Sequence, residues 1–370
     1  MKILYLAAVR LPTEKAHGVQ IMKTCEALAN KGVEVELVIP GRKTPIMEDA
    51  FEYYDVKRNF TITNLHTPDW VGQGAFGFAL SLLWFSEAAK WRKSFWNADV
   101  IYSRDALVLA QYAFLGRTVI WESHDGVWNL WVWIVSKFTR AIVVVSEGLR
   151  DFYLEKGVPP GKVTVIRNGI DLSSFDAAES KESSRERLNI PDNLPIVMYV
   201  GALDGWKGTD TLLASTEFFK DKARLVVIGG SNEQITKLQS RYPDVLFLGF
   251  RPQKELADNL AAADVVVLPN TGKSEIATRF TSPLKLFAYM ASGKPIIATD
   301  LPAARELIDE ESAYLVKPDD PKALAHSIVE ALNNPAEAER RGHNARTQIK
   351  GFSWHARAKN ILQLLSEFKQ

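Results

Sequence analysis

The stretch "RFTSPLKLFAYMASGKPIIATD", residues 279–300, decides the fold class of this chain. It begins as a loop, and Ser282 and Pro283 then suit a helix start, with the hydroxyl as N-cap and the proline as first helical residue. The apolar run "PIIATD" that follows is typical of a buried strand. A helix that leads into a buried strand predicts one step of a parallel α/β sheet.

The same alternation of short apolar strands and helical patterns runs through both halves of the chain. Helical stretches such as 19–31, 76–96 and 127–140 separate the strands of the first half. The expected strands are "KILYLAAV", "EVELVIP", "DVIYS", "TVIWES", "AIVVVS" and "VTVIRN", then "IVMYVGA", "ARLVVIGG", "VLFLGF", "DVVVLPN", "PIIATD" and "AYLVK". The pattern predicts an α/β protein whose parallel sheets are covered by helices on both faces.

One segment interrupts this alternation and divides the chain. Residues 171–193 are rich in Ser, Glu and Asp and show no strand pattern, which predicts a linker. We therefore expect two Rossmann-like, doubly wound domains facing a cleft, an N-terminal one over residues 1–170 and a C-terminal one over 194–350. Residues 351–370 form an amphipathic pattern, which predicts a helix that returns to the first domain. Ligands of such sheets bind at the carboxyl ends of the strands.

Composition excludes several classes of protein. The net charge of +1 gives no electrostatic basis for binding nucleic acid. The single cysteine, Cys25, excludes an internal disulfide and a cysteine-rich metal site. The N-terminus lacks a signal-peptide cleavage pattern, and no apolar run reaches the roughly 18 residues of a membrane span. The cytoplasm is the expected location.

The second half of the chain contains a candidate anion site. The first amides of the helix after Pro283, those of Leu284 and Lys285, should point out of the helix end, where the helix dipole favours negative charge. Arg279 and Lys285 add full positive charges. This arrangement suits a diphosphate; the alternative is a capped helix with two solvated basic residues.

Three turns after expected strands could complete that site. The turn in "VGALDGWKGTD" offers Gly201 and Lys207, and the one in "VIGGSNEQ" offers Gly230, where backbone can approach a ligand closely. In "LGFRP", Phe250 and Arg251 could present backbone groups to a flat base. Each stretch taken alone also fits an ordinary turn.

The first half offers two candidates. Gly18, in "AHGVQ", opens the first helix, and no G-x-G-x-x-G pattern supports a dinucleotide cofactor. His124, in "WESHDG", ends a strand and is the best catalytic candidate; a surface histidine is the alternative. We find no metal-ligand spacing and expect no metal site.

Eight of the ten tryptophans lie between Trp70 and Trp133. Trp84, Trp91 and Trp96 stand close to basic residues within "WFSEAAKWRKSFW". Aromatic rings beside basic groups suit peripheral contact with an anionic membrane, here its inner, cytoplasmic face. The alternative is an aromatic-rich core.

Together these motifs resemble the retaining, nucleotide-sugar-dependent glycosyltransferases of family 4, which have the GT-B fold. "SPLKLFAYMASGKPIIATDLP" resembles that family's S-P-x-K-x-F-E-Y-M-A-x-G-x-P-I-x-A, and "WKGTDTLL" its W-K-G-x-x-x-L-L. "IRNGIDLSSF", "IVVVSEGLRD" and "FSWHARA" resemble its N-G-[VI]-D motif, its V-x-x-S-E motif and its closing helix. The resemblance covers nearly the whole chain.

The resemblance implies roles for matching residues. Lys207 and Lys285 would face the donor diphosphate, and His124 would lie near the donor sugar. Gly18 would belong to a mobile glycine loop, and Phe250 and Arg251 would hold the base through their backbone.

Three positions depart from the family pattern. Ala202 stands where many members have arginine, and Phe280 is not acidic. Ala288 stands where the family has a glutamate that holds ribose hydroxyls. An alanine there should leave a gap for water on the ligand-facing side of the helix.

We therefore expect a metal-independent hexosyltransferase that needs no cofactor beyond its nucleotide-sugar substrate and acts on a glycan, lipid-linked or small-molecule acceptor. Ala288 favours one alternative, a non-catalytic or impaired nucleotide-sugar-binding protein of the same fold. A second alternative is a GT-B-fold epimerase, which lacks the S-P-x-K stretch and the closing helix.

Overall fold

The computed structural model describes residues 1–191 and 193–368. The chain forms two compact units. Unit 1 comprises Met1–Asn168 and Trp354–Gln370, and unit 2 comprises Gly169–Ser353. Residue 192 of the expected linker and residues 369–370 of the expected terminal helix lie outside the described residues.

Unit 1 is built on a parallel sheet with the strand order β3-β2-β1-β4-β5-β6-β7. Six of its strands coincide with the expected apolar runs, and β3 is an additional edge strand. Their bounds are β1 (Lys2–Leu6), β2 (Glu34–Pro40), β3 (Thr61–Leu65), β4 (Val100–Ser103), β5 (Val119–Ser123), β6 (Ala141–Val144) and β7 (Val163–Val165).

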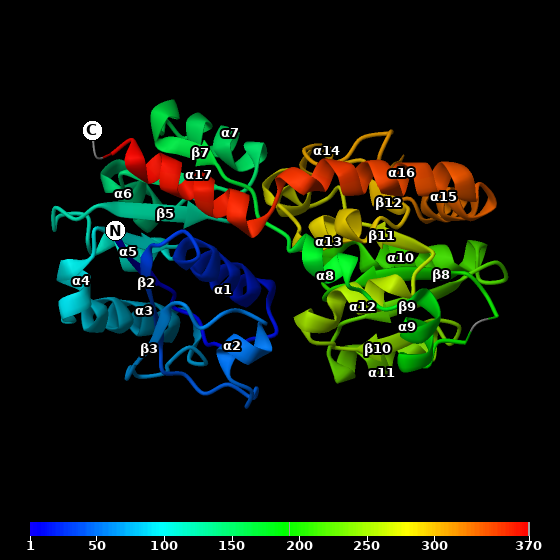
Figure 1. Ribbon diagram of the computed structural model, residues 1–370, viewed down its shortest axis with the longest axis horizontal. Helices are drawn as coiled ribbons and strands as arrows, with labels where there is room; N and C mark the ends of the chain where they lie inside the picture. Colours follow the sequence, from blue (N-terminus) through cyan, green and yellow to red (C-terminus); the bar gives the residue numbers. More distant parts are fainter. Residues whose placement is uncertain (192, 369–370) are drawn as a thin grey trace. The chain divides into compact units, whose positions relative to one another are not determined.

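Helices cover this sheet (Figure 1). They are α1 (Ala16–Ala29), α2 (Ala50–Tyr53), α3 (Gly74–Lys90), α4 (Lys93–Asn97), α5 (Ala106–Ala110), α6 (Leu130–Phe138), α7 (Glu147–Glu155) and α17 (Trp354–Ser366). The stretch 76–96, expected as one helix, breaks into α3 and α4 because Arg92 adopts an extended conformation. The C-terminal α17 packs against α1, which confirms the expected return to the first domain.

Unit 2 repeats the scheme with six parallel strands in the order β10-β9-β8-β11-β12-β13. The sequence predicts every one of them. Their bounds are β8 (Ile196–Val200), β9 (Arg224–Ile228), β10 (Leu246–Gly249), β11 (Val265–Leu268), β12 (Ile296–Thr299) and β13 (Tyr314–Val316). Its helices are α8 (Leu172–Asp176), α9 (Lys181–Arg187), α10 (Thr209–Ser215), α11 (Asn232–Arg241), α12 (Leu256–Ala261), α13 (Leu284–Ser292), α14 (Pro302–Arg305), α15 (Pro321–Asn333) and α16 (Pro335–Gln348).

The segment 171–193 differs from the linker expected from its composition. It carries α8 and α9, and it belongs to unit 2. Arg185 is buried and donates to Asp264 at 2.6 Å, while Phe175 and Leu188 join the apolar core of the unit. Lys181 and Arg185 therefore pair with Asp264 of unit 2, and Phe175 and Leu188 dock the segment there.

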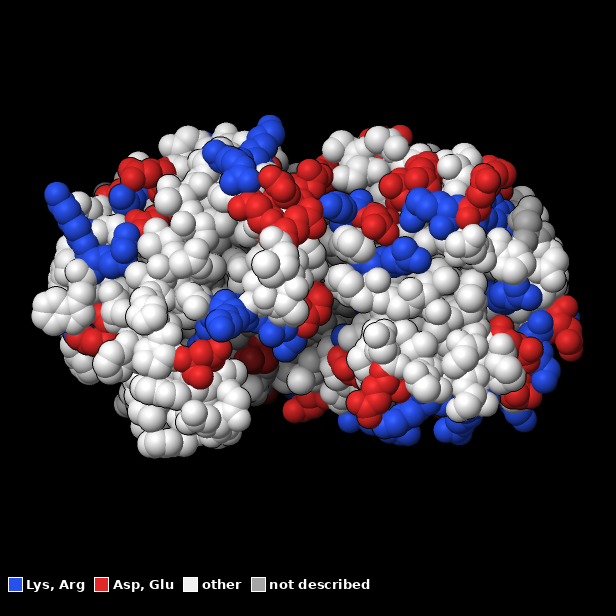
Figure 2. Space-filling model, turned by 90° about the horizontal axis from the view of Figure 1, so that it is seen from below, with Lys and Arg blue, Asp and Glu red and all other residues white. Residues whose placement is uncertain are grey.

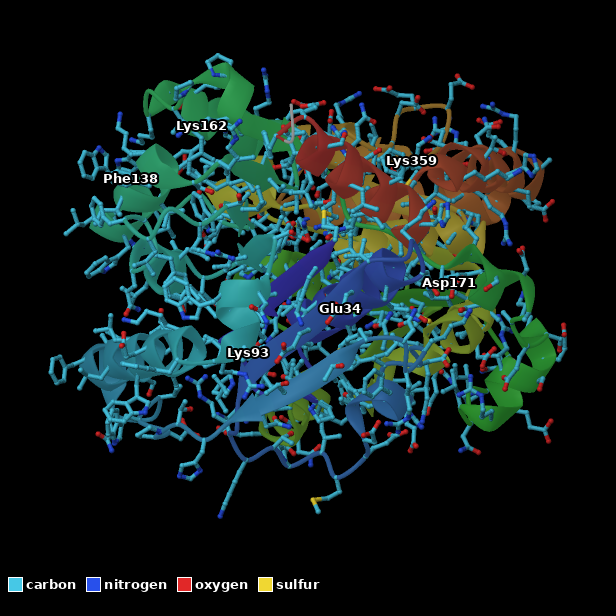
Figure 3. The ribbon with its side chains drawn as sticks, turned by 60° about the vertical axis from the view of Figure 1, so that its left-hand side comes forward. Glu34, Lys93, Phe138, Lys162, Asp171 and Lys359 are labelled. Carbon is cyan, nitrogen blue, oxygen red and sulfur yellow. The ribbon has the colours of Figure 1, made fainter. Side chains whose placement is uncertain are left out.

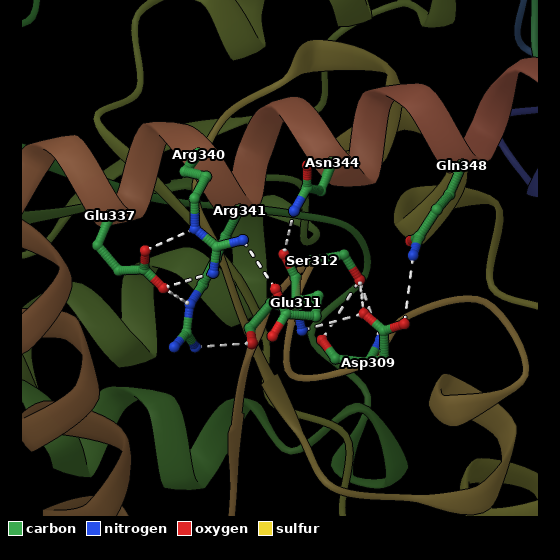
Figure 4. Close-up of polar contacts among 9 residues, drawn as sticks. Asp309, Glu311, Ser312, Glu337, Arg340, Arg341, Asn344 and Gln348 are labelled. Atoms are coloured by element: carbon green, nitrogen blue, oxygen red, sulfur yellow. Dashed lines mark hydrogen bonds and ion pairs between the residues drawn. The ribbon is translucent and has the colours of Figure 1, made fainter.

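A polar network fixes α16 to the loop that precedes β13 (Figure 4). Arg340 donates to the Glu311 carboxylate at 2.7 Å, and Asn344 donates to the Glu311 carbonyl at 2.8 Å. One helical turn further on, Gln348 reaches Asp309 at 3.3 Å. The network closes the α16 side of unit 2.

Candidate functional site

The order of the strands locates the ligand-binding edge of each sheet. Consecutive connections change direction between β1 and β4 in unit 1 and between β8 and β11 in unit 2. In open α/β sheets, ligands bind beyond the carboxyl ends of the strands at such a switch point. In unit 2 this edge carries residues 201–208 after β8 and residues 269–271 after β11.

The turn after β8 is closely packed at two of its glycines, Gly201 and Gly208. Gly201 has φ of 146°, and a Cβ there would lie 2.8 Å from the Lys285 ammonium. Gly208, which the sequence reasoning missed, has φ of 66°, and a Cβ there would lie 1.7 Å from the Pro269 carbonyl oxygen. Both positions therefore require glycine, and they hold the β8 and β11 turns together. Gly230 follows β9 on the same sheet edge.

Lys285, in the first turn of α13, reaches the end of β8. Its ammonium donates to the Tyr199 hydroxyl at 2.8 Å and lies 4.1 Å from the centre of that ring. The Tyr199 hydroxyl in turn donates to the Ala202 carbonyl at 2.8 Å. Within residues 1–191 and 193–368, Lys285 forms no ion pair. Burial, and then the charge of Lys207, holds the pKa of Lys285 well below its usual range.

The second predicted lysine lies nearby. Lys207 follows the β8 turn and pairs with Asp204 at 3.0 Å. Its charge acts on Lys285, so the structure brings the two lysines into one electrostatic site. Arg279 belongs to a short π-helix, Ile276–Phe280, that precedes α13, and its guanidinium carbon lies 5.7 Å from the centre of the Phe280 ring. The segment that carries Arg279 contacts the turn that carries Lys207, so Arg279, Lys207 and Lys285 all belong to elements at this edge of unit 2.

The start of α13 corrects the predicted cap. The helix begins at Leu284, Pro283 is its N-cap residue, and no side chain caps it by a hydrogen bond. The N-cap prediction for Ser282 is therefore wrong by one residue, because Pro283 itself has an extended backbone, with φ of −70° and ψ of 115°, and so stands before the helix rather than as its first residue. The first-turn amides of Leu284 and Lys285 keep their place at the helix end, where an α-helix offers no internal acceptor.

Ala288 lies three residues after Lys285 in α13 and is buried. Its side chain has no exposed area and belongs to the apolar core of unit 2, together with Leu268 and Ala298. Apolar side chains therefore surround this residue, in place of the water-filled, ligand-facing gap that the sequence predicts. Phe250 and Arg251 follow β10, and the Phe250 ring is half exposed.

The remaining two candidates belong to unit 1. Gly18 is buried in the first turn of α1, where a Cβ would lie 2.1 Å from the Tyr54 hydroxyl. That hydroxyl accepts from the Thr13 amide at 2.7 Å, so Tyr54 holds the loop between β1 and α1 against the glycine. His124 follows β5, and its Nε2 lies 2.5 Å from Glu122.

Glu122 is the site residue that sequence reasoning missed. It is completely buried, although it is charged, and Gln20, Tyr102 and Arg357 also surround it. A signal was present, since Glu122 interrupts an apolar strand that the same reasoning predicts to be buried.

The two halves of the chain match two families of sequences. Residues 17–174 match the family described as Glycosyltransferase Family 4, and residues 194–334 match the one described as Glycosyl transferases group 1. The chain belongs to the glycosyltransferases of family 4. A D-inositol 3-phosphate glycosyltransferase of Kineococcus radiotolerans is 23% identical to it over 94% of this chain and 89% of its own length.

Solved structures share the fold of this glycosyltransferase. Sucrose-phosphate synthase from Thermosynechococcus elongatus superposes with a TM-score of 0.81 at 22% identity, over 100% of this chain and 99% of the other. Anabaena HepE in complex with UDP-glucose superposes with a TM-score of 0.75 at 18% identity, over 99% and 100%. The GT-B fold, the family and a transferase activity are thus confirmed, and the non-catalytic alternative is not favoured. No helix in the described part of the chain has the length and apolar character to cross a membrane.

Proposed function

We propose that this glycosyltransferase moves a hexose, with retention, from a nucleotide diphosphate sugar to a glycan, a lipid-linked or a small-molecule acceptor. One observation carries the donor assignment. Lys285 holds its ammonium at the switch point of unit 2 against a tyrosine rather than a carboxylate. A diphosphate supplies the negative charge that this cation lacks in the protein.

The other residues take roles around that group. Lys207, Arg279 and the start of α13 add positive charge where the leaving diphosphate develops its own, an electrostatic task that needs no metal or further cofactor. The glycine turns at Gly201 and Gly230 allow the donor to approach the backbone. Phe250 and Arg251 would hold the base, while Gly18 and His124 of unit 1 would serve the sugar and the acceptor.

Turnover of labelled donors tests this function. We expect transfer from one member of a panel of UDP-, GDP- and ADP-sugars, in the presence of EDTA, and an anomeric configuration in the product that matches the donor by NMR. UDP-glucose stands first in the panel because HepE binds it. Transfer with inversion would contradict the retaining assignment, and a requirement for added metal would contradict the charge role of the lysines.

The buried position of Ala288 sharpens a prediction about ribose binding. A glutamate carboxylate at this buried position should lower the unfolding free energy of the donor-free protein by several kcal/mol when it finds no hydrogen-bond partner. A hydrogen bond from a ribose hydroxyl of the bound donor to this carboxylate should restore about 1.5–3 kcal/mol of that free energy. We therefore expect Ala288→Glu to lower the Tm of the free protein and to show a larger donor-induced rise in Tm than the parent chain.

The matched control for that variant is Ala291→Glu. Ala291 lies in the same helix and is also fully buried in the apolar core of unit 2. This control should lose stability without the extra donor response. Equal donor-induced shifts in the two variants would mean that ribose is not bound near residue 288.

We also propose that unit 1 contacts an anionic membrane at its inner face. Helices α3, α4, α5 and α6 are neighbours, and large uncharged areas appear on the surface of unit 1 (Figure 2). Seven aromatic residues in or next to these helices, here called the aromatic face, have exposed side chains and so do not form an aromatic core. They are Phe76, Trp84, Trp91, Trp96, Phe114, Trp133 and Phe138. Lys93 and Phe138 both belong to unit 1 (Figure 3), and Lys90, Arg92 and Lys93 adjoin Trp91 in the sequence, so basic groups accompany the rings.

Binding to lipid vesicles tests the aromatic face. Trp91 is 79% exposed and Phe114 is 80% exposed, so we expect Trp91→Ser with Phe114→Ser to lower sedimentation with anionic vesicles severalfold. Salt should weaken the binding of the parent chain. Phe218→Ser is the control, since Phe218 is an exposed ring of unit 2. Equal sedimentation of all three proteins, or none at low salt, would contradict the membrane contact.

A further inference from the structure

The Glu122 carboxylate, at the end of β5, is the centre of a buried polar cluster in unit 1. Its Oε1 lies 2.6 Å from the Gln20 amide nitrogen, 2.7 Å from the Arg357 guanidinium and 2.5 Å from His124 Nε2. Its Oε2 accepts from the Tyr102 hydroxyl at 2.5 Å. Three of these groups contact Oε1 and one contacts Oε2, so donors reach both oxygens of the carboxylate.

The ionised state of Glu122 is set by Arg357. The Arg357 side chain is 1% exposed, and its second terminal nitrogen donates to the carbonyls of Ile166 and Arg167 at 2.6 and 2.9 Å. Its charge has no other buried carboxylate among its hydrogen-bond partners in the described chain. Burial alone would raise the pKa of Glu122, but Arg357 and then His124 outweigh it and hold that pKa well below its usual range.

An ionised carboxylate can only accept hydrogen bonds, which fixes the proton on His124. The contact between His124 Nε2 and Glu122 therefore requires the proton to lie on Nε2. Burial, and then the charge of Arg104, lowers the pKa of His124 to about 4, so the ring is neutral at pH 7. In a neutral ring with the proton on Nε2, Nδ1 is the free acceptor.

We propose that Glu122 and Arg357 are positioning residues that hold His124 in the tautomer protonated on Nε2 and leave Nδ1 to accept from the substrate. The inference rests on the proposed role of His124 in transfer. It also implies that the C-terminal helix α17 contributes to the reaction, because this helix carries Arg357. Arg357 lies on the buried face of α17, with Ala358 and Ile361, and this face packs against the rest of unit 1. Docking of the helix therefore places the arginine next to Glu122.

The other groups around Glu122 are compatible with this role. Burial, and then the charge of Glu122, raises the pKa values of Tyr5 and Tyr102 far above their ordinary value, so both stay neutral, and Tyr102 donates to Glu122. Arg104 donates to the side-chain oxygen Oε1 of Gln20 at 3.1 Å, which turns the side-chain nitrogen Nε2 of Gln20 toward Glu122. Within the described residues, no other carboxylate touches the His124 ring.

The test combines NMR with kinetics on the full chain. In ¹⁵N-histidine-labelled protein, the His124 signal, assigned by its loss in His124→Asn, should show protonated Nε2 and unprotonated Nδ1. Glu122→Gln keeps the shape of the side chain but can also donate, so we expect a mixture of tautomers and a kcat lowered about 10- to 100-fold with little change in the donor KM. Arg357→Lys, which keeps the charge, should retain more activity than Arg357→Met.

Two further variants supply a substitute and a control for these measurements. Glu122→Gln with Arg357→Gln removes both buried charges together and is the substitute if Arg357→Met does not fold. His355→Ala is the matched control, because His355 joins α17 to Lys31 of α1 at 2.5 Å without touching Glu122, and it should keep the parent tautomer and kcat.

An unchanged His124 tautomer in Glu122→Gln would overturn the proposal, as would a parent kcat in both Glu122→Gln and Arg357→Met. The NMR measurement needs no turnover. A parent chain that shows the expected tautomer but transfers no sugar would therefore count against the proposed function alone.

Discussion

Lys285→Met is expected to lower kcat/KM for the nucleotide-sugar donor by about 100- to 1,000-fold, the effect of removing one preorganised charge from a transition state. The dissociation constant of the nucleoside diphosphate should rise by roughly tenfold or more. Both effects follow from the position of this ammonium, which Tyr199 holds at the switch point without a carboxylate partner. Lys207→Met should change kcat/KM and the dissociation constant in the same directions but by smaller factors, because Lys207 is already paired with Asp204.

The same substitution should make the free protein more stable. The pKa of Lys285 is lowered by burial and then by Lys207, so at any pH below that lowered value the charged lysine opposes folding. Methionine fills a similar volume without the charge. We therefore expect the Tm of Lys285→Met to rise while donor binding falls, a combination that a purely structural lysine would not give.

Lys294→Met is the control for this pair of effects. Lys294 follows the other end of α13, is partly buried and donates to the Ala261 carbonyl at 3.0 Å. Its replacement should leave donor affinity and turnover at the parent values. Donor binding by Lys285→Met that equals that of the parent chain would remove Lys285 from the site.

The fold was predictable where strands are short, continuous apolar runs, and twelve of the described strands coincide with such runs. The strand β3 (Thr61–Leu65) was missed because it lies at the edge of its sheet, alternates polar with apolar residues and is mostly not buried. The segment 171–193 was misjudged because composition does not reveal partners that are distant in the sequence, such as Asp264 for Arg185.

The candidate site divides in the same way. Residues of local motifs, such as Lys207 and Lys285, could be placed near each other because their strands end at one edge of a sheet. The cap at Ser282 was displaced by one residue, a difference that a helix pattern cannot resolve. The contact between Glu122 and Arg357 spans 235 residues and depends on how α17 docks, so no local pattern indicates it.

Breaking the contact between Glu122 and Arg357 should strongly destabilise this glycosyltransferase. Glu122→Ala leaves the Arg357 charge buried without its partner, and such a loss typically costs about 3–5 kcal/mol of unfolding free energy. Replacing both residues, as in Glu122→Ala with Arg357→Met, should cost less than Glu122→Ala alone. Urea unfolding at pH 7 measures these differences, and Asp176→Ala, which breaks an exposed contact with Arg346, is the control.

The pH dependence of the same comparison tests the charge of Glu122. Its pKa in the folded protein is lowered from 4.5, so its ionised form stabilises the fold above about pH 4.5, and this contribution decreases as the pH falls toward the folded pKa. The difference in unfolding free energy between the parent chain and Glu122→Ala should therefore stay constant from pH 8 to about 5.5 and shrink at lower pH. A difference that grows as the pH falls would mean that Glu122 is protonated in the folded protein, and Glu122 could then donate to His124 rather than accept from it.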